Sequence, residues 1–284
     1  MKPIIDGIEM QSPIMNASGC HCTTRNELNE LDNSSAGAVI SKSCTINSRI
    51  GNDLPRYYDT SSLSINSTGL ANEGWEYYSK IKLSKPYIIS VAGIEKGDNI
   101  YILKQLQECY NCDMIELNLS CPNIIGKPQI GYDFEDSYEL LRQVFEFNEK
   151  KIGIKLPPYF DMIHFNYMSD ILNEFTPSYI TCINSLGNGF VFDDDFKPSI
   201  VPKNGYGGIG GSIIKPFGLS NVRHFHELLP NLNIIGCGGI IDSRDVKEYL
   251  ISGAKMVQIG TQLVKEGPSC FKRIIDEFTY INFI

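Results

Sequence analysis

The sequence lacks long apolar segments and runs of basic residues. Its apolar stretches are short, as in YIISVAGI at 87–94, whereas a membrane-spanning helix needs roughly 20 apolar residues. Lysine and arginine together number 25 and aspartate and glutamate 33, which gives a net charge of −8. An acidic chain of this kind gives no electrostatic reason to bind nucleic acid or an anionic membrane surface. We therefore expect neither nucleic acid nor a membrane as a partner.

Signals for export and for metal binding are missing as well. The first residues, MKPIIDGIEM, fit neither a signal peptide nor an arginine-rich transit sequence, so a cytoplasmic location is the default expectation. The nine cysteines are an odd number and, without a secretory signal, are expected to be free thiols. The pairs Cys109/Cys112 and Cys20/Cys22 have no second pair at zinc-finger spacing, so no metal site is expected.

No serine–glycine tract, charge block or low-complexity run divides the chain, which favours a single domain over residues 1–284. Short β-branched runs that end in small or polar residues alternate with stretches of helical spacing. The eight runs span 12–19, 36–43, 87–93, 114–121, 151–157, 179–185, 233–239 and 256–261. The helical stretches lie near 24–33, 97–110, 135–150, 160–175, 218–229, 242–252 and 266–280, with Asp98, Asp242 and Ser243 as candidate N-caps.

This alternation predicts an α/β fold whose parallel strands are covered on both sides. Eight strand–helix units in 284 residues fit a (β/α)8 barrel, or TIM barrel. A doubly wound open sheet is the competing fold, but no GxGxxG follows the first run. The aperiodic segments 44–86 and 186–217 are too long for plain connections. We expect them to supply inserted loops and small strands on the C-terminal face of the barrel.

In a parallel barrel the active site lies at the C-terminal ends of the strands. The seventh and eighth runs end in the glycine turns GCGG at 236–239 and IGT at 259–261, where barrels commonly hold a phosphate on backbone N–H groups. The stretch GGIGG at 207–211 could approach the same group. Tight turns need glycine in any case, but two such turns at these positions favour a phosphate-bearing ligand.

Two lysines end apolar runs, Lys42 and Lys155. One lysine there could extend its ammonium to the rim of the barrel. Two on one face favour contact with an anion or with cofactor oxygens, because an unpaired buried charge is costly.

Four asparagines stand at strand ends or in a tight loop: Asn66, Asn118, Asn123 and Asn184. A carboxamide offers both donors and an acceptor, so a converging group would suit a flat, amide-like heterocycle. Each one taken alone is also a candidate for a turn or a cap.

Cys121 directly follows the fourth run, in SCPN, where Pro122 fixes the backbone. Buried cysteines are often small hydrophobes, which is our interpretation of Cys44, Cys182 and Cys237. A thiol at a strand end is better suited to proton transfer or nucleophilic attack. No histidine completes a triad, since His164, His224 and His226 lie on predicted helices and His21 has no partner. We therefore prefer Cys121 as a general base.

Several motifs together resemble the dihydroorotate dehydrogenases, and more narrowly the soluble class 1A enzymes. The motifs are NASG (16–19), SKS (41–43), LPRY (54–57), SINSTGL (64–70), ELNLSCPNIIGKPQ (116–129), KLPPYFD (155–161), INSLGNG (183–189), GYGGIGG (205–211), GCGG (236–239) and QIGT (258–261). The resemblance covers nearly the whole chain. Class 1 has cysteine as the base where class 2 has serine, which agrees with Cys121. Thr68 stands where class 1A relatives usually have methionine.

The resemblance implies one FMN-binding barrel domain over residues 1–284, with the flavin held non-covalently across the C-terminal face. The residues that it places on FMN are Ser18, Lys42, Ser43, Asn118, Lys155, Ile183, Gly211, Gly238, Gly239, Gly260 and Thr261. Those that it places on the substrate are Lys42, Asn66, Gly69, Leu70, Asn118, Asn123, Asn184 and Ser185.

The reaction that the resemblance implies is oxidation of (S)-dihydroorotate to orotate in pyrimidine biosynthesis. Cys121 removes the C5 proton, C6 delivers hydride to the flavin, and Lys155 stabilises the charge that appears on the reduced flavin. Fumarate then accepts the electrons in the same site and becomes succinate. The resemblance also implies a homodimer.

Three other interpretations remain open at this point. A class 1B catalytic subunit would pass electrons to NAD through an iron–sulfur partner, although GYGGIGG and LPRY look more like class 1A. A related FMN barrel could act on another pyrimidine. A non-enzymatic binding protein on the same fold would be favoured by loss of Cys121 or Lys42, but both are present.

Overall fold

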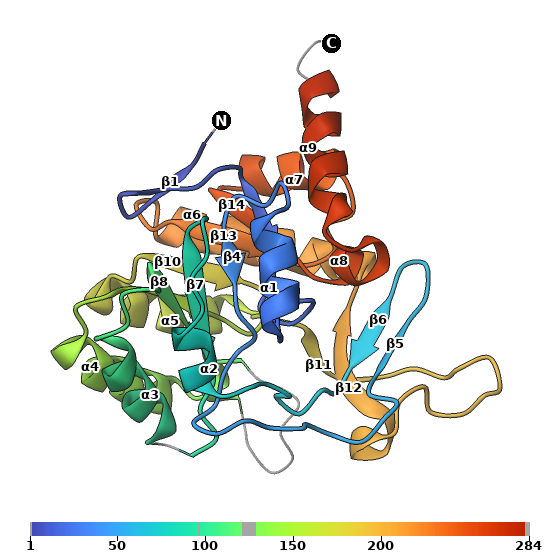
Figure 1. Ribbon diagram of the computed structural model, residues 1–284, viewed down its shortest axis with the longest axis horizontal. Helices are drawn as coiled ribbons and strands as arrows, with labels where there is room; N and C mark the ends of the chain where they lie inside the picture. Colours follow the sequence, from blue (N-terminus) through green and yellow to red (C-terminus); the bar gives the residue numbers. More distant parts are fainter. Residues whose placement is uncertain (1, 96, 121–128, 282–284) are drawn as a thin grey trace.

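Eight parallel strands form a barrel at the centre of the molecule (Figure 1). The computed structural model describes residues 2–95, 97–120 and 129–281. The barrel strands are β3 (Ile14–Asn16), β4 (Val39–Ile40), β7 (Tyr87–Val91), β8 (Met114–Asn118), β9 (Lys151–Lys155), β10 (Tyr179–Cys182), β13 (Ile234–Cys237) and β14 (Met256–Ile259). Each lies within one of the eight predicted runs, so the predicted (β/α)8 barrel is confirmed.

The two ends of this sheet meet at β3 and β4, where a side chain takes the place of ladder hydrogen bonds. The order of the strands is β3-β14-β13-β10-β9-β8-β7-β4. The amide of Asn16 on β3 donates to the carbonyl of Ile40 on β4 at 2.8 Å and accepts from its N–H at 3.0 Å. Because these contacts join the outer strands, the sheet is a barrel and not the open doubly wound alternative.

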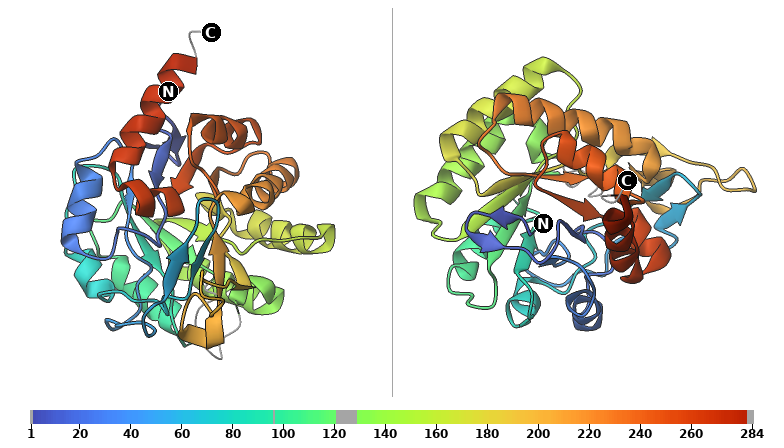
Figure 2. Two further views of the ribbon diagram at one scale, coloured as in Figure 1. Left: turned by 90° about the vertical axis from the view of Figure 1, so that its right-hand side faces the viewer. Right: turned by 90° about the horizontal axis from the view of Figure 1, so that it is seen from above.

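Helices surround the barrel (Figure 2). They are α1 (Arg25–Asp32), α2 (Trp75–Ser79), α3 (Asp98–Leu106), α4 (Phe134–Phe147), α5 (Met162–Phe175), α6 (Lys215–Leu228), α7 (Ser243–Ile251), α8 (Thr261–Glu266) and α9 (Ser269–Ile281), with short 3-10 turns η1 (Ile130–Tyr132), η2 (Pro202–Gly205) and η3 (Ser212–Ile214). Asp242 caps α7 as predicted. Asp98 does not cap α3, because its carboxylate accepts from the N–H groups of Ile94 and Glu95 in the preceding loop. Among the described residues, no helix combines the length and the apolar character needed to cross a bilayer.

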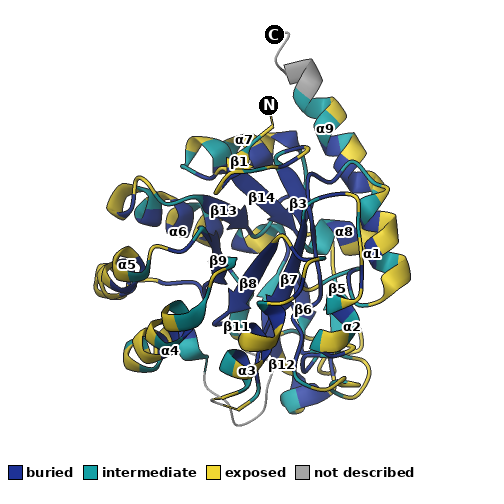
Figure 3. Ribbon diagram, turned by 60° about the vertical axis from the view of Figure 1, so that its left-hand side comes forward, coloured by how far each residue is buried: buried dark blue, intermediate teal, exposed yellow. Residues whose placement is uncertain are grey.

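Alternate residues of the strands supply two apolar cores, since successive side chains point to opposite faces. Ile88 and Met114 point into the barrel, where they join Tyr179 and Met256. Ile89 and Ile115 point outward to the helices. Figure 3 shows the strands buried and the outer faces of the helices exposed.

The N-terminal ends of the barrel strands are covered by the hairpin of β1 (Ile4–Ile5) and β2 (Ile8–Glu9). Ile5 packs into the inner core. Asp6 in the turn accepts from the hydroxyl of Ser178 at 2.7 Å, and its carbonyl accepts from Lys151 at the start of β9. Among the residues that the structure describes, this end is therefore filled, which leaves the C-terminal end for a ligand.

The two long aperiodic segments build a second sheet of four antiparallel strands, in the order β11-β12-β6-β5. Its strands are β5 (Tyr57–Asp59), β6 (Ser64–Asn66), β11 (Leu186–Phe190) and β12 (Tyr206–Gly210). The predicted small strands in 44–86 and 186–217 are thus confirmed. The side chain of Ser64 meets that of Thr261 at 2.9 Å, which places this sheet beside the C-terminal end of β14.

Candidate active site

A cavity of about 260 Å³ lies between the C-terminal ends of the barrel strands and the small sheet. Of the predicted site residues, those that line it are Ser18, Lys42, Ser43, Asn66, Leu70, Asn118, Lys155, Ile183, Asn184, Ser185, Gly211, Gly238, Gly239, Gly260 and Thr261. Thr68 lines it as well. Residues that are far apart in the sequence therefore meet in one place, as parallel strands in a barrel require.

Three predicted site residues need separate comment. Cys121 and Asn123 lie outside the described residues. Gly69 does not line the cavity, although its neighbours Thr68 and Leu70 do. Its φ is 67°, and a Cβ atom added to it would lie 2.3 Å from Oδ1 of Asn52. Only glycine fits there without strain, so Gly69 serves the turn.

The two predicted lysines are buried at the ends of β4 and β9, with 7% and 4% of their surface exposed. The ammonium of Lys42 donates to the carbonyl of Gly19 at 3.0 Å. That of Lys155 donates to Oε1 of Gln258 at 3.0 Å. Neither forms an ion pair within the part of the chain that the structure describes. Two buried positive charges thus face one cavity, which suits an anionic or electron-rich ligand.

Asn118, the last residue of β8, connects the amide groups of the site. Its Nδ2 donates to the hydroxyl of Ser43 at 3.3 Å, and its Oδ1 accepts from the N–H of Ser120 at 3.0 Å and from Nδ2 of Asn184 at 3.3 Å. The hydroxyl groups of Ser43 and Ser90 lie 2.9 Å apart. These bonds fix the orientation of each amide, so the group presents a defined pattern of donors and acceptors.

At the other end of the cavity, the turn after β13 requires glycine. Gly238 and Gly239 have φ angles of 128° and 71°. A Cβ atom on Gly239 would lie 2.7 Å from Cβ of Lys215 and 3.0 Å from the carbonyl oxygen of Gly211. The carbonyl of Gly238 accepts from the Tyr249 hydroxyl at 2.7 Å. Bare backbone therefore faces the cavity here, as a phosphate site requires.

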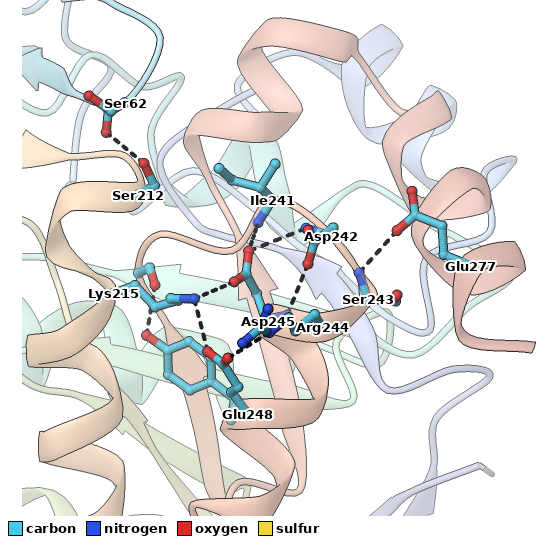
Figure 4. Close-up of polar contacts among 12 residues, drawn as sticks. Ser62, Ser212, Lys215, Ile241, Asp242, Ser243, Arg244, Asp245, Glu248 and Glu277 are labelled. Carbon is cyan, nitrogen blue, oxygen red and sulfur yellow. Dashed lines mark hydrogen bonds and ion pairs between the residues drawn. The ribbon is translucent and has the colours of Figure 1, made fainter. Parts of the chain in front are cut away.

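Charged side chains hold the segment that follows this turn, as Figure 4 shows for Lys215, Asp245 and Ile241. The ammonium of Lys215 lies 2.6 Å from Oδ1 of Asp245 and 2.8 Å from Oε2 of Glu248. The other carboxylate oxygen of Asp245 accepts from the N–H of Ile241 at 2.7 Å. Burial lowers the pKa of Lys215, but its hydrogen bonds to Asp245 and Glu248 outweigh burial and raise that pKa above its ordinary value. The hydrogen bond from Lys215 in turn lowers the pKa of Glu248. Both partners are therefore charged at neutral pH.

Two thiols line the cavity, those of Cys20 and Cys237. Burial raises the pKa of Cys20, although the charge of Lys42 opposes the shift. Burial also raises the pKa of Cys237 against the charge of Lys155. Both groups are therefore neutral thiols at neutral pH, and neither is suited to act as a base.

Several polar residues of the site were not predicted from the sequence. Tyr57, Ser64 and Gln258 line the cavity, and Glu116 accepts a hydrogen bond from the amide of Gln258. For Glu116 a signal was present, because a carboxylate in the middle of an apolar parallel strand must have a buried partner. The others come from segments without periodicity or from strand positions that carry no distinctive pattern.

Comparison with known proteins identifies the family. The family model described as dihydroorotate dehydrogenase matches residues 2–281. The dihydroorotate dehydrogenase A (fumarate) of Lactococcus lactis subsp. lactis (strain IL1403) is 48% identical over 291 residues, with 99% of this chain and 94% of the relative covered. The dihydroorotate dehydrogenase (fumarate) of Lachancea kluyveri is 49% identical over 274 residues, with 93% and 87% covered.

A solved structure shows the same fold at low sequence identity. It is a DHODH in complex with ferulenol from Eimeria tenella, with a TM-score of 0.79 and 16% identity, and the match covers 99% of this chain and 84% of that one. The family assignment rests on the family model and on the relatives. The model matches nearly the full length of the chain, and the relatives are 48% and 49% identical over nearly all of it. The chain belongs to the dihydroorotate dehydrogenase family.

Proposed function

We propose that this protein oxidises (S)-dihydroorotate to orotate in pyrimidine biosynthesis, with FMN as cofactor and fumarate as the final electron acceptor. The observation that carries the proposal is the cavity itself. The buried lysines Lys42 and Lys155 and the hydrogen-bonded amides of Asn118 and Asn184 line one part of it, and the turn at Gly238 and Gly239 lines another. Relatives that are 48% and 49% identical are named for the fumarate-dependent enzyme, which supports fumarate over NAD as acceptor.

The cavity fits FMN in its chemistry. The turn at Gly238 and Gly239 carries no side chain, and a Cβ on Gly239 would clash with Lys215, so the backbone of the turn can approach a phosphate closely. The donors of Lys155 and Asn118 suit the polar edge of a flavin ring. The residues that would hold FMN are Ser18, Lys42, Ser43, Asn118, Lys155, Ile183, Gly211, Gly238, Gly239, Gly260 and Thr261. When bound, FMN supplies the acceptor for the hydride and passes the electrons to the second substrate.

The substrate is anionic and carries ring amide groups. Lys42 provides a buried positive charge, and the carboxamides of Asn118 and Asn184 provide paired donors and acceptors. The residues that would hold the substrate are Lys42, Asn66, Leu70, Asn118, Asn184 and Ser185 in the cavity, with Gly69 shaping the turn beside Leu70. To these the resemblance adds Asn123, which lies outside the described residues. Fumarate is a small dicarboxylate and can use the same lysine and amides once orotate has left.

Cys121 acts as the general base and removes the proton from C5 of dihydroorotate, while the hydrogen at C6 departs as hydride. Ser120, the residue before it, lines the cavity, which supports this role. Lys155 places a positive charge where negative charge develops during hydride transfer. In the return half-reaction a hydride and a proton are delivered to fumarate. The sum is dihydroorotate plus fumarate giving orotate plus succinate.

The decisive experiment uses the purified protein. We expect flavin absorption in the isolated protein, bleaching when dihydroorotate is added without oxygen, and return of the colour with fumarate but not with NAD. Absence of bleaching would contradict dihydroorotate as substrate. Bleaching without reoxidation by fumarate would contradict fumarate as acceptor and would indicate a class 1B enzyme, which reaches NAD only through an iron–sulfur partner.

Three further features belong to this proposal. Residues 1–284 act as one FMN-binding domain, the protein is a homodimer, and it works in the cytoplasm. The absence of any linker-like segment supports the first. The dimer and the location rest on the resemblance to class 1A enzymes. Sedimentation equilibrium at micromolar protein concentration tests the dimer, because a monomer would give half the molecular mass expected for the dimer.

A further inference from the structure

A chain of buried polar side chains runs from the floor of the cavity into the barrel. The ammonium of Lys155 donates to Oε1 of Gln258 at 3.0 Å, and Nε2 of Gln258 donates to Oε2 of Glu116 at 2.8 Å. The hydroxyl of Thr181 donates to the same oxygen of Glu116 at 2.8 Å. Lys155 and Gln258 line the cavity, whereas Glu116 does not. The chain therefore connects the candidate site to a carboxylate behind it.

Strand periodicity explains why Glu116 is in this position. It lies on β8 two residues after Met114, which is in the inner apolar core, and two residues before Asn118, which lines the cavity. These three side chains point into the barrel, because alternate residues of a strand share a face. Glu116 thus occupies a polar layer between the apolar plug and the ligand. Its neighbour in register on β9 is Gly153, which leaves space for the ring of Tyr179.

The chemistry of the groups fixes the direction of this chain. A lysine ammonium can only donate, so the oxygen of the Gln258 amide must face Lys155. The amide nitrogen then faces Glu116, whose Oε2 accepts from Gln258, from Thr181 and, at 3.5 Å, from the hydroxyl of Tyr179. The position of the ammonium is therefore coupled to the position of the carboxylate through one rigid amide.

This arrangement is costly for stability. Glu116 and Gln258 have no exposed surface, and Oε1 of Glu116 has no hydrogen-bond partner among the described residues. Burying a carboxylate in this way is unfavourable, and replacing buried ionic groups by apolar ones of similar volume is often neutral or stabilising. Glu116 and Lys155 also do not touch, since the amide separates them. A role in the reaction explains the carboxylate better than a role in stability does.

We propose that Glu116 is a positioning residue that acts through Gln258 on Lys155. It holds the ammonium toward the cavity and offsets part of its charge, so that the reduced flavin is stabilised only partly and still gives its electrons to fumarate. This inference rests on the proposed function, because it assigns Lys155 to the flavin.

The test is the reduction potential of the bound flavin in Glu116→Gln, measured by dithionite titration against a reference dye. Glutamine keeps the shape and one acceptor oxygen but removes the negative charge. We expect a tenfold gain in the preference of the site for reduced over oxidised flavin, which is a positive shift of about 30 mV for a two-electron couple. Bleaching by dihydroorotate should persist, and reoxidation by fumarate should slow by a similar factor.

Two further variants make the result specific. Thr181→Val removes one of the two other hydrogen bonds to the same oxygen, leaves the bond from the Tyr179 hydroxyl at 3.5 Å, and keeps the charge, so its potential should equal that of the wild type. Glu116→Met removes the charge with an apolar side chain of similar length and should shift the potential in the same direction as glutamine. If the Glu116→Gln variant fails to fold, Glu116→Met is the variant that tests the effect of removing the charge.

An unchanged or more negative potential in the charge-removing variants would overturn the proposal. An equal shift in Thr181→Val would overturn it too, because packing and not charge would then be responsible. Failure of the proposed function has a separate readout: dihydroorotate would not bleach the flavin of the wild-type protein. Even then, the dye titration would still compare the flavin potentials of the variants, because it needs no substrate. A wild-type protein that binds no flavin overturns both.

Discussion

Asn118 shows how a single residue sets the geometry of the site. Its amide donates to Ser43 and accepts from Ser120 and Asn184, so both ends of the amide are engaged. An amide held in this way cannot rotate without breaking hydrogen bonds, and Asn118 is buried, so each lost bond is expensive. The pattern of donors and acceptors offered to a substrate is therefore set before the substrate arrives, which reduces the ordering cost of binding.

Replacing Cys121 by alanine should stop dihydroorotate oxidation while leaving a yellow, FMN-loaded protein. A general base typically contributes about 10²–10⁴-fold to the rate, and we expect a loss in that range. The measurement is the rate of anaerobic flavin bleaching by dihydroorotate in a stopped-flow instrument. Cys109→Ala is the matched control, because this thiol is buried and does not line the cavity. Full activity in the Cys121 variant would rule out the assignment.

The rate of flavin reduction by dihydroorotate should increase with pH above neutrality. An unperturbed thiol has a pKa of about 8.5 and is mostly protonated at pH 7. The active form of Cys121 is the thiolate, so the rate rises about tenfold per pH unit well below the pKa and levels off above it. Flavin content measured at each pH separates loss of cofactor from loss of the base. A rate constant that does not change from pH 7 to the alkaline range would contradict the role of Cys121.

At this scale the sequence predicted residues that end strands and missed those that support them. Lys42, Lys155 and Asn118 were identified because a polar residue that closes an apolar run must face the C-terminal end. Gln258 was missed because its partners, Lys155 and Glu116, are more than 100 residues away in the chain. Pairing between distant strands decides such contacts, and no local pattern encodes it.

At the scale of elements, the turn between β13 and α7 depends on glycine and on the ion pairs behind it. Replacing Gly239 by alanine adds a Cβ 2.7 Å from Cβ of Lys215 at a φ of 71°. A left-handed conformation costs an ordinary residue roughly 1–2 kcal/mol, and the steric clash adds to this. The turn must therefore shift, and we expect the Kd for FMN to increase at least about tenfold, which is about 1.4 kcal/mol.

The measurement is fluorescence titration of the apoprotein with FMN. Gly97→Ala is the matched control, because a Cβ there meets nothing within 4 Å and its φ is −83°. The control should bind FMN like the wild type. Equal affinity in Gly239→Ala would show that the turn does not hold the phosphate.

The elements themselves were predictable where the hydrophobic period is sustained. All eight barrel strands fall within predicted runs, because strands covered on both faces are almost continuously apolar. The helices α2 and α8 were missed. They have five and six residues, too few for a helical period to be recognised. The small sheet was expected from loop length alone, since its pairing joins segments more than 100 residues apart.

At the scale of the whole molecule, the charge in the site has the opposite sign to the net charge of the chain. The chain carries a net charge of −8, yet its substrates are anions. The buried ammonium groups of Lys42 and Lys155 lie in a cavity where the dielectric constant is low and attraction over a short range is strong. Salt screens the exposed charges much more than the buried ones. Local charge in the cavity therefore decides which ligand binds.

One barrel that contains the whole site should unfold as one unit. We expect far-UV circular dichroism and flavin fluorescence to report the same melting temperature, because the cavity draws on residues from β3 through α8. FMN at 100 times its Kd should stabilise the protein by about 2.7 kcal/mol. For a domain of this size that corresponds to a rise of roughly 5–10 °C over the apoprotein. The Gly239→Ala variant at the same FMN concentration is the control and should gain less. Two separate transitions, or release of flavin well before loss of secondary structure, would contradict a single domain.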